Sequence, residues 1–318
     1  MKIILCLSAL LAFFPFISLR AQSIQKESEE TDGSTIGISA DYVSNSEIYG
    51  IFNNFVTQPI TSATFNYSGK KGLNLVVSGL INGNGNASSS KNSPELDFTG
   101  GWDFNLWNDA LFISPSYSHF IFSSGATTLK SMYTDQAEVG LTGLFNWFKP
   151  SVAADYLFGT KNAMNFNLTL GFDLKFENVF SKGNSLQFSP SIGTNYGNLS
   201  HSLTIPKNLL QFLLPLRTTY GDSYTIQQLE ANSSIAKKKA IEKQLSNINS
   251  TATLAQIFAT KNNFQINSVG LALPLSYTTK NLAFNAGLNI SEPMNVPGYL
   301  KSNTIFYFSA GVIYSFNL

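Results

Sequence analysis

Charged side chains are sparse in this sequence, and the most informative ones stand among Asn, Ser, Thr and Gly in segments where polar and apolar residues alternate. Six of these charged residues are acidic and one is basic: Asp41, Asp97, Asp103, Glu138, Asp155, Asp173 and Lys175. Carboxylates that line a pore favour cations, so this set predicts a weakly cation-preferring passage. The alternatives are that the carboxylates pair with loop lysines or with Arg217, or that water simply solvates them.

Other reactive side chains are few. The two histidines, His119 and His201, and the single cysteine, Cys6, leave little for a transition-metal site. No glycine motif of the phosphate-binding or dinucleotide-binding type occurs, and Gly83 and Gly85 lie in an Asn-Gly run that is typical of a turn. We therefore expect no metal, no cofactor and no enzymatic activity.

The composition points away from soluble and nucleic-acid-binding proteins. Charged residues make up 12% of the chain, against about 25% in ordinary soluble domains. Hydrophobic residues reach 43%, yet beyond the leader no segment has the roughly 18 continuous apolar residues of a spanning helix. The formal net charge of +1 becomes +1 − 2 = −1 when Lys2 and Arg20 leave with the leader, and nucleic-acid binding needs a basic face.

Residues 1–21 read as a secretory signal peptide. Lys2 supplies the positive charge, an apolar stretch follows, and small residues precede a cleavage site expected between Ala21 and Gln22. Cys6 lies within this leader, so we expect no disulfide, thiolate metal site or cysteine nucleophile in the mature chain. Residues 22–33 are polar and charged, which predicts a flexible tail. An uncleaved membrane anchor is the alternative interpretation of the leader.

Alternation with a period of two dominates from residue 34 onward. Between 164 and 176 the even positions are apolar and the odd positions are Asn, Thr, Gly, Asp or Lys. A helix cannot separate these two sets, whereas a strand places each on its own face. The same pattern predicts twelve strands, at about 35–44, 59–67, 73–81, 95–106, 111–122, 132–147, 151–158, 163–176, 185–196, 264–277, 282–291 and 304–318. The alternation changes phase near His119, which suggests a β-bulge there.

Connection lengths and aromatic positions support a membrane barrel. Short turns are predicted at 68–72, 107–110, 148–150, 177–184 and 278–281, and longer loops at 45–58, 82–94, 123–131, 197–263 and 292–303; the short connection 159–162 is the exception. Membrane barrels have short turns on the periplasmic side and long loops outside. Aromatic residues gather near both ends of the predicted strands, as expected at the two membrane interfaces. A soluble β-sandwich would scatter them along the strands.

The last predicted strand carries a short terminal pattern. Polar, glycine and aromatic residues occur in the order Ser309, Gly311, Tyr314 and Phe316. In this respect the chain resembles the outer-membrane β-barrel proteins of Gram-negative bacteria, whose final strand is read by the barrel-assembly machinery. That family often ends in Phe, whereas Asn317 and Leu318 follow here. The resemblance covers about 35–318 and concerns architecture. It implies an all-β, up-and-down antiparallel transmembrane barrel over 34–318, embedded in outer-membrane lipid.

Twelve-stranded outer-membrane phospholipases are the enzymatic relatives to consider. Their signature places a serine two residues after a histidine. Here Ile121 and Leu203 occupy those positions after His119 and His201, so the signature fails.

The connection 197–263 differs from the rest of the chain. Pro206 begins an apolar run, and apolar residues recur at near-helical spacing over about 225–247 around Lys237, Lys238 and Lys239. We expect two short helices that form either a surface cap or a constriction inside the lumen. Two functions stay open: a porin-like channel for small polar solutes, or a non-conducting barrel that presents 197–263 to a ligand or partner.

Overall fold

The computed structural model describes residues 33–44, 47–48, 51–52, 59–82, 94–122, 133–159, 162–198, 207–232, 234, 238–239, 245, 250–258, 264–294 and 304–318. The predicted signal peptide lies outside the described residues, as does the predicted tail apart from Gly33.

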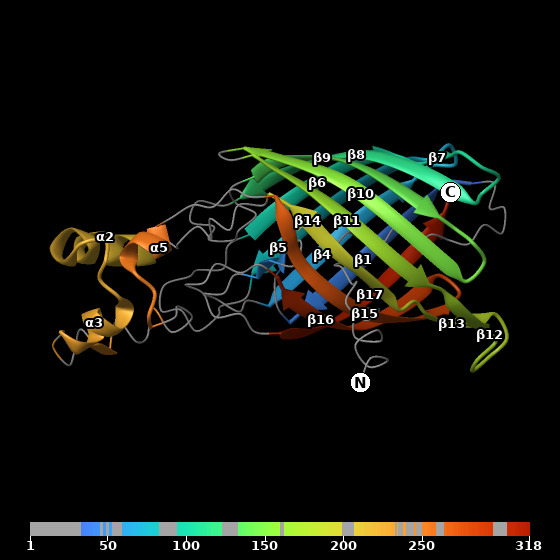
Figure 1. Ribbon diagram of the computed structural model, residues 1–318. Coiled ribbons are helices and arrows are strands. Elements are labelled where there is room, and N and C mark those ends of the chain that lie inside the picture. Colours follow the sequence, from blue (N-terminus) through green and yellow to red (C-terminus); the bar gives the residue numbers. More distant parts are fainter. Residues whose placement is uncertain are drawn as a thin grey trace, which may run out of the picture.

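Antiparallel strands form most of the regular structure (Figure 1). The main sheet contains β1 (Thr35–Val43), β4 (Ile60–Ser68), β5 (Leu73–Asn82), β6 (Pro94–Trp102), β7 (Phe104–Asn105), β8 (Leu111–Phe122), β9 (Tyr133–Gly143), β10 (Phe148–Gly159), β11 (Ala163–Phe172), β12 (Leu174–Glu177), β13 (Asn184–Phe188), β14 (Ser191–Gly197), β15 (Gln265–Thr279), β16 (Leu282–Pro293) and β17 (Ile305–Asn317). A separate pair consists of β2 (Glu47–Ile48) and β3 (Ile51–Phe52). The helices are α2 (Lys207–Tyr220), α3 (Ile226–Ala231) and α5 (Leu254–Phe258).

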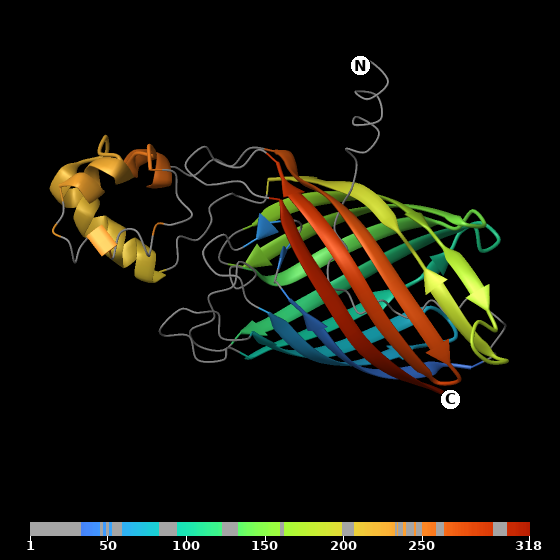
Figure 2. The same ribbon diagram turned by 90° about the horizontal axis from the view of Figure 1, so that it is seen from below.

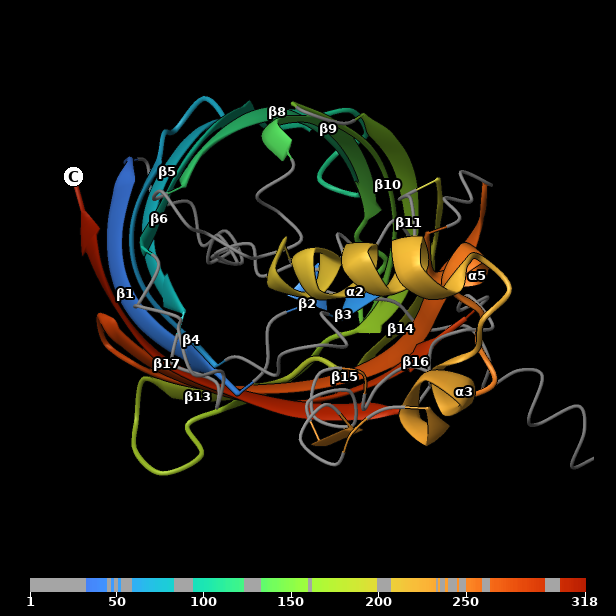
Figure 3. The same cartoon turned by 90° about the vertical axis from the view of Figure 1, so that its left-hand side faces the viewer.

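The main sheet closes into a twelve-stranded barrel, as the sequence predicted (Figure 3). Successive strands pair around the ring, and β1 pairs with β17 from Thr35↔Asn317 to Val43↔Ser309. The count treats three broken strands as one each, because β7 continues β6, β12 continues β11 and β13 precedes β14. The β13–β14 break falls at 189–190, where Pro190 has no N–H to donate.

Alternation sorts the side chains onto two walls. Along β17, Phe306, Phe308, Val312, Tyr314 and Phe316 point outward and are 36% to 65% exposed. The intervening residues of this strand, from Ile305 to Ser315, are buried or half-buried. Similar outward apolar residues occur on the other strands of the barrel. A closed barrel with such an outer wall is suited to lipid, because no backbone edge is left without a hydrogen-bond partner.

The two ends of the barrel differ in their connections. The short connections 69–72, 144–147 and 280–281 lie at one end, and the long connections lie at the other. Residues with positive φ make the short turns possible: Gly72 (φ 90°), Asn146 (φ 60°) and Lys280 (φ 51°). The predicted alternation of short and long connections therefore follows from turn chemistry at one rim.

Two sequence predictions about individual strands were wrong in detail. β9 ends at Gly143 and β10 begins at Phe148, because Asn146 turns the chain earlier than the predicted turn at 148–150. The predicted bulge near His119 does not exist, since β8 pairs with both neighbours without a register shift. Register shifts occur instead between Phe158 and Gly159 and between Asn195 and Tyr196.

The helices of the connection 197–263 lie beyond the ends of the strands, at the long-loop end (Figures 1 and 2). Several apolar residues of this connection are buried and at most 4% exposed: Leu213, Leu216, Ile226, Leu229, Leu245 and Leu254. We call residues 207–258 the helical unit. Within the part of the chain that the structure describes, no helix is both long and apolar enough to cross a membrane.

Candidate functional site: the lumen wall

The lumen-facing positions of the strands carry the charged residues that the sequence singled out. By alternation, the lumen side of the strands carries Asp41, Asp97, Glu138 and Asp155. Asp103 and Asp173 continue this alternation at the one-residue breaks between β6 and β7 and between β11 and β12. Lys175 differs, because it lies on β12, in a hairpin that extends past the neighbouring strands (Figure 1). There its Nζ lies 3.5 Å from Glu177 Oε1.

Near the short-turn end, the carboxylates are held by neighbouring polar groups. Asp103 accepts hydrogen bonds from Asn74 Nδ2 at 2.5 Å and from Ser114 Oγ at 2.5 Å. Asp173 Oδ2 lies 3.8 Å from Lys149 Nζ. Both partners of this ion pair are about 30% exposed, so water reaches this level of the lumen. Lys149 was not singled out from the sequence, because the strand that carries it was predicted to start after it.

Nearer the long-loop end, side-chain amides form a continuous hydrogen-bonded chain across five adjacent strands. Asn267 Nδ2 donates to Asn195 Oδ1 at 2.8 Å, and Asn195 Nδ2 donates to Asn167 Oδ1 at 2.6 Å. Asn167 Nδ2 donates to Asp155 Oδ2 at 2.7 Å, and Gln136 Nε2 donates to Asp155 Oδ1 at 2.6 Å. We call Gln136, Asp155, Asn167, Asn195 and Asn267 the amide chain. Both oxygens of its one carboxylate accept amide protons.

The lumen is closed to solvent at the level of the amide chain. Asp155, Asn195 and Asn267 are each at most 1% exposed, although they face the lumen. Inward residues of other strands near the same rim are also buried, and many are apolar: Val43, Phe120, Tyr133, Leu157 and Tyr307 are each at most 6% exposed. Figure 3 shows β2 and β3 within the ring of strands when the barrel is viewed from the helical end. The lumen is therefore accessible near the short turns and occluded near the long loops.

Sequence reasoning took the inward positions as mostly polar and did not predict these apolar inward residues at the long-loop end. The change of phase near His119 was their signal. Ser116 and Ser118 face the lumen, and Phe120 continues on the same face. An apolar inward residue is tolerated there because the lumen is filled at that level, whereas a water-filled lumen would favour polar residues.

His119 itself faces outward. Its Nδ1 lies 2.8 Å from Asp135 Oδ1, and Tyr117 and Thr134 also donate hydrogen bonds to Asp135. The position two residues after His119 is Ile121, which is exposed on the outer wall. The phospholipase arrangement of histidine and serine is thus not formed at His119. Among the described residues, no three His, Cys, Asp or Glu side chains group as a metal site.

The helical unit is built around a local pseudo-two-fold relation. Residues 225–229 and 253–257 share the pattern Thr, apolar, any, Gln, apolar. Ile226 N donates to Ala252 O at 3.1 Å, and Leu254 N donates to Tyr224 O at 3.0 Å. The two Thr-to-Gln capping interactions are equivalent as well. The repeat in the sequence, 28 residues apart, is the signal that would have predicted this pairing.

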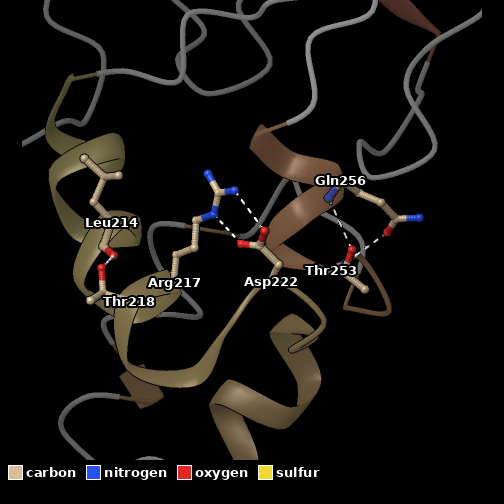
Figure 4. Close-up of polar contacts among 6 residues, drawn as sticks. All are labelled: Leu214, Arg217, Thr218, Asp222, Thr253 and Gln256. Atoms are coloured by element: carbon tan, nitrogen blue, oxygen red, sulfur yellow. Dashed lines mark hydrogen bonds and ion pairs between the residues drawn. The ribbon is translucent and has the colours of Figure 1, made fainter.

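Polar contacts fasten the ends of these helices (Figure 4). Arg217, in the last turn of α2, forms a bidentate ion pair with Asp222. Hydrogen bonding from Arg217 lowers the pKa of the Asp222 carboxyl below its ordinary value. At α5, Gln256 N donates to Thr253 Oγ1 at 3.2 Å. The helical unit thus has its own buried residues and its own polar ties, independent of the lumen.

Comparison with solved structures returns barrels of the outer membrane. The KdgM porin is 9% identical with a TM-score of 0.42, covering 88% of this chain and 99% of its own. The NanC porin is 8% identical with a TM-score of 0.40, covering 88% and 98%. The COG4313 outer membrane channel from Pseudomonas putida F1 is 7% identical with a TM-score of 0.42, covering 89% and 96%. LpxR from Salmonella typhimurium is 10% identical with a TM-score of 0.41, covering 88% and 99%.

No protein-family model matches the sequence, and comparison with curated proteins gave no match. At these identities and TM-scores the similar structures assign neither a solute nor an activity. The class rests on the structure itself: a closed, twelve-stranded antiparallel barrel with an apolar outer wall and a mainly polar inner wall is a transmembrane β-barrel.

Proposed function

We propose that this chain is an outer-membrane channel for the passive diffusion of small polar solutes, with a preference for cations among ions. The observation that carries the proposal is the inner wall, where acidic residues outnumber basic ones and Asp103 lies at a level that water reaches. Carboxylates along a pore raise the local concentration of cations. The occluded outer end favours a low unit conductance, because any passage there is narrow.

Three further expectations belong to this proposal. The leader would export the chain, and residues 309–316 of β17 would present the terminal pattern to the barrel-assembly machinery. In the folded barrel Tyr314 and Phe316 face outward, and a Cβ at Gly311 would overlap the carboxylate of Asp41. Outer-membrane lipid would then cover the outward residues. Fractionation of cells that express the full chain, with sequencing of the mature N-terminus, tests export and cleavage after Ala21.

Single-channel recording of the refolded mature protein in a planar bilayer tests the channel. Discrete openings with a reversal potential on the cation side are expected in a salt gradient. Asp103→Asn should move that potential toward zero. Asp222→Asn makes the same charge change in the helical unit and should leave it unaltered. A folded barrel that never conducts would refute the channel.

The independently packed helical unit favours a second candidate function, a non-conducting barrel that displays residues 207–258 to a partner. Protease treatment of intact cells tests whether this unit faces the cell exterior or the periplasm. Cleavage at the exposed Lys239 is expected if the unit faces the cell exterior. Loss of every surface cross-link to other molecules on deleting 207–258 would support display, whereas retention of all of them would count against it.

A further inference from the structure

A β-bulge brings an extra amide into the lumen wall. Along β15, Ile266 faces outward and both Asn267 and Ser268 are buried on the lumen side, after which Val269 resumes the outward phase. The cause is the register shift against β14, where Asn195 pairs with Ser268 and Tyr196 pairs with Ile266. Bulges re-aim side chains in this way and are frequent beside functional sites. Without the bulge, Asn267 could not reach the amide chain.

Three asparagines meet at this bulge. Asn267 Nδ2 lies 2.8 Å from Asn195 Oδ1 and 3.5 Å from Asn165 Oδ1. The close packing extends to the backbone, because a Cβ at Gly197 would lie 2.5 Å from Met164 O and 2.6 Å from Asn165 Oδ1. We call Asn165, Asn195 and Asn267 the asparagine cluster.

The cluster keeps one donor and one acceptor unused. Asn165 Nδ2 and Asn267 Oδ1 have no hydrogen-bond partner, although their residues are at most 1% exposed. Buried polar groups are nearly always hydrogen-bonded, and an exception calls for a functional explanation. These two atoms lie within the same cluster, on β11 and β15, with β14 between them. Together they can donate one hydrogen bond to a hydroxyl group and accept one from it.

We propose that the asparagine cluster is the solute-selecting contact of the lumen and that it takes an uncharged polyhydroxylated solute. A hydroxyl can accept from Asn165 Nδ2 and donate to Asn267 Oδ1 at once. An anion is disfavoured, because it would approach the Asp155 carboxylate. Among the described residues, no cationic side chain is bonded to the cluster to offset that charge. Each Asp155 oxygen already accepts an amide proton, which weakens its attraction for a cation.

The position of the cluster makes such contact unavoidable. The lumen is occluded at this level, so a solute that crosses it has to exchange hydration water for the wall's amides. Acidic residues nearer the short turns act on ions at the other end of the lumen, and the cluster acts on the organic solute. This inference rests on the proposed channel and assigns it a substrate class.

The test measures block of the ion current by three related sugars. Glucose, glucuronate and glucosamine are added in turn to the protein in a planar bilayer, and the half-blocking concentration of each is recorded. Glucose should block at the lowest concentration. Asn267→Leu and Asn165→Leu should each raise that concentration about tenfold, the usual effect of one lost neutral hydrogen bond. Asn285→Leu, on the lumen side of β16 opposite Ser276, is the matched control and should leave it unchanged.

A parallel measurement separates this inference from the channel itself. Equilibrium dialysis of labelled glucose against folded protein in detergent does not need conduction, and a gel-shift assay verifies that each variant is folded. If a variant does not fold, Asn165→Asp takes its place, because it keeps Oδ1 and nearly the same shape and replaces only the unpartnered Nδ2 donor. Binding without conduction would support the cluster and refute the channel. Conduction with no preference for glucose, or with block unchanged in the folded variants, would refute solute selection by the asparagine cluster. The proposed channel function would not be affected by that result.

Discussion

Replacing Asn195 with leucine removes the link between Asn167 and Asn267 in the amide chain at nearly constant volume. Asn195 is fully buried, donates to Asn167 Oδ1 at 2.6 Å and accepts from Asn267 Nδ2 at 2.8 Å. The substitution deletes both hydrogen bonds and leaves polar groups of the buried Asn267 and the half-buried Asn167 without that partner. Each such group costs about 1–3 kcal/mol. The expected loss in the free energy of unfolding is therefore about 2–5 kcal/mol, since Asn267 Nδ2 keeps the longer contact to Asn165.

Urea unfolding of the barrel in lipid vesicles measures this loss. The three tryptophans, Trp102, Trp107 and Trp147, are all exposed on the outer wall or in short turns, so their fluorescence reports contact with lipid. Asn285→Leu is the control, because Asn285 faces the lumen but is half-buried. Its expected cost is below about 1 kcal/mol.

Two results would refute this reasoning about the amide chain. The first is an equal cost for Asn195→Leu and Asn285→Leu, which would mean that burial and hydrogen bonding at 195 contribute nothing specific. The second is strict additivity of Asn195→Leu with Asn267→Leu. Residues that share a hydrogen bond show coupling energies of about 0.5–3 kcal/mol, so the double variant should lose less than the sum of the single variants.

Two further predictions concern the short turns and the helical unit. Gly72→Ala should destabilise the barrel by more than about 1 kcal/mol, since φ is 90° and a Cβ would overlap Asp103 O; Gly79→Ala, with open space around its Cβ, should be nearly neutral in the same urea assay. Arg217 lowers the pKa of Asp222, so the ion pair stabilises the helical unit above the unfolded pKa of about 3.9, and this contribution is lost as pH falls through the lower folded pKa. Pepsin cleavage within 207–258 should therefore rise in that acidic range, and Asp222→Asn should weaken the rise; an unchanged pH profile in this variant would contradict the role of the pair.

The architecture was predictable because the determining signal is local. An outward residue must be apolar to meet lipid, and its neighbour then faces the lumen, so period-two alternation by itself identified the strands and their count. The alternation of short and long connections is also local, because a short turn needs residues such as Gly72 or Asn146 that accept positive φ. The conclusion about fold class therefore needed no knowledge of which strands pair.

The acidic character of the lumen wall was predictable from the sequence, but the contacts of its residues were not. Inward position and charge follow from alternation, so Asp103 and Asp155 could be selected in the sequence. Their partners could not, because Asn74 and Gln136 come from other strands and meet them only through the register of the ladder. Even the placement of Lys149 beside Asp173 depended on where Asn146 turns the chain.

The sequence by itself determined a twelve-stranded barrel with an apolar outside, an acidic inside and one unusual helical connection. The tertiary structure decided which of those inward residues meet. A one-residue bulge against β14 turned Asn267 into the lumen, and packing inside the barrel at the long-loop end buried Val43 and Phe120. The helical unit buries its apolar residues among its own helices, so it does not need the lumen to cover them. Each of these outcomes depends on contacts between residues far apart in the chain, which no local pattern encodes.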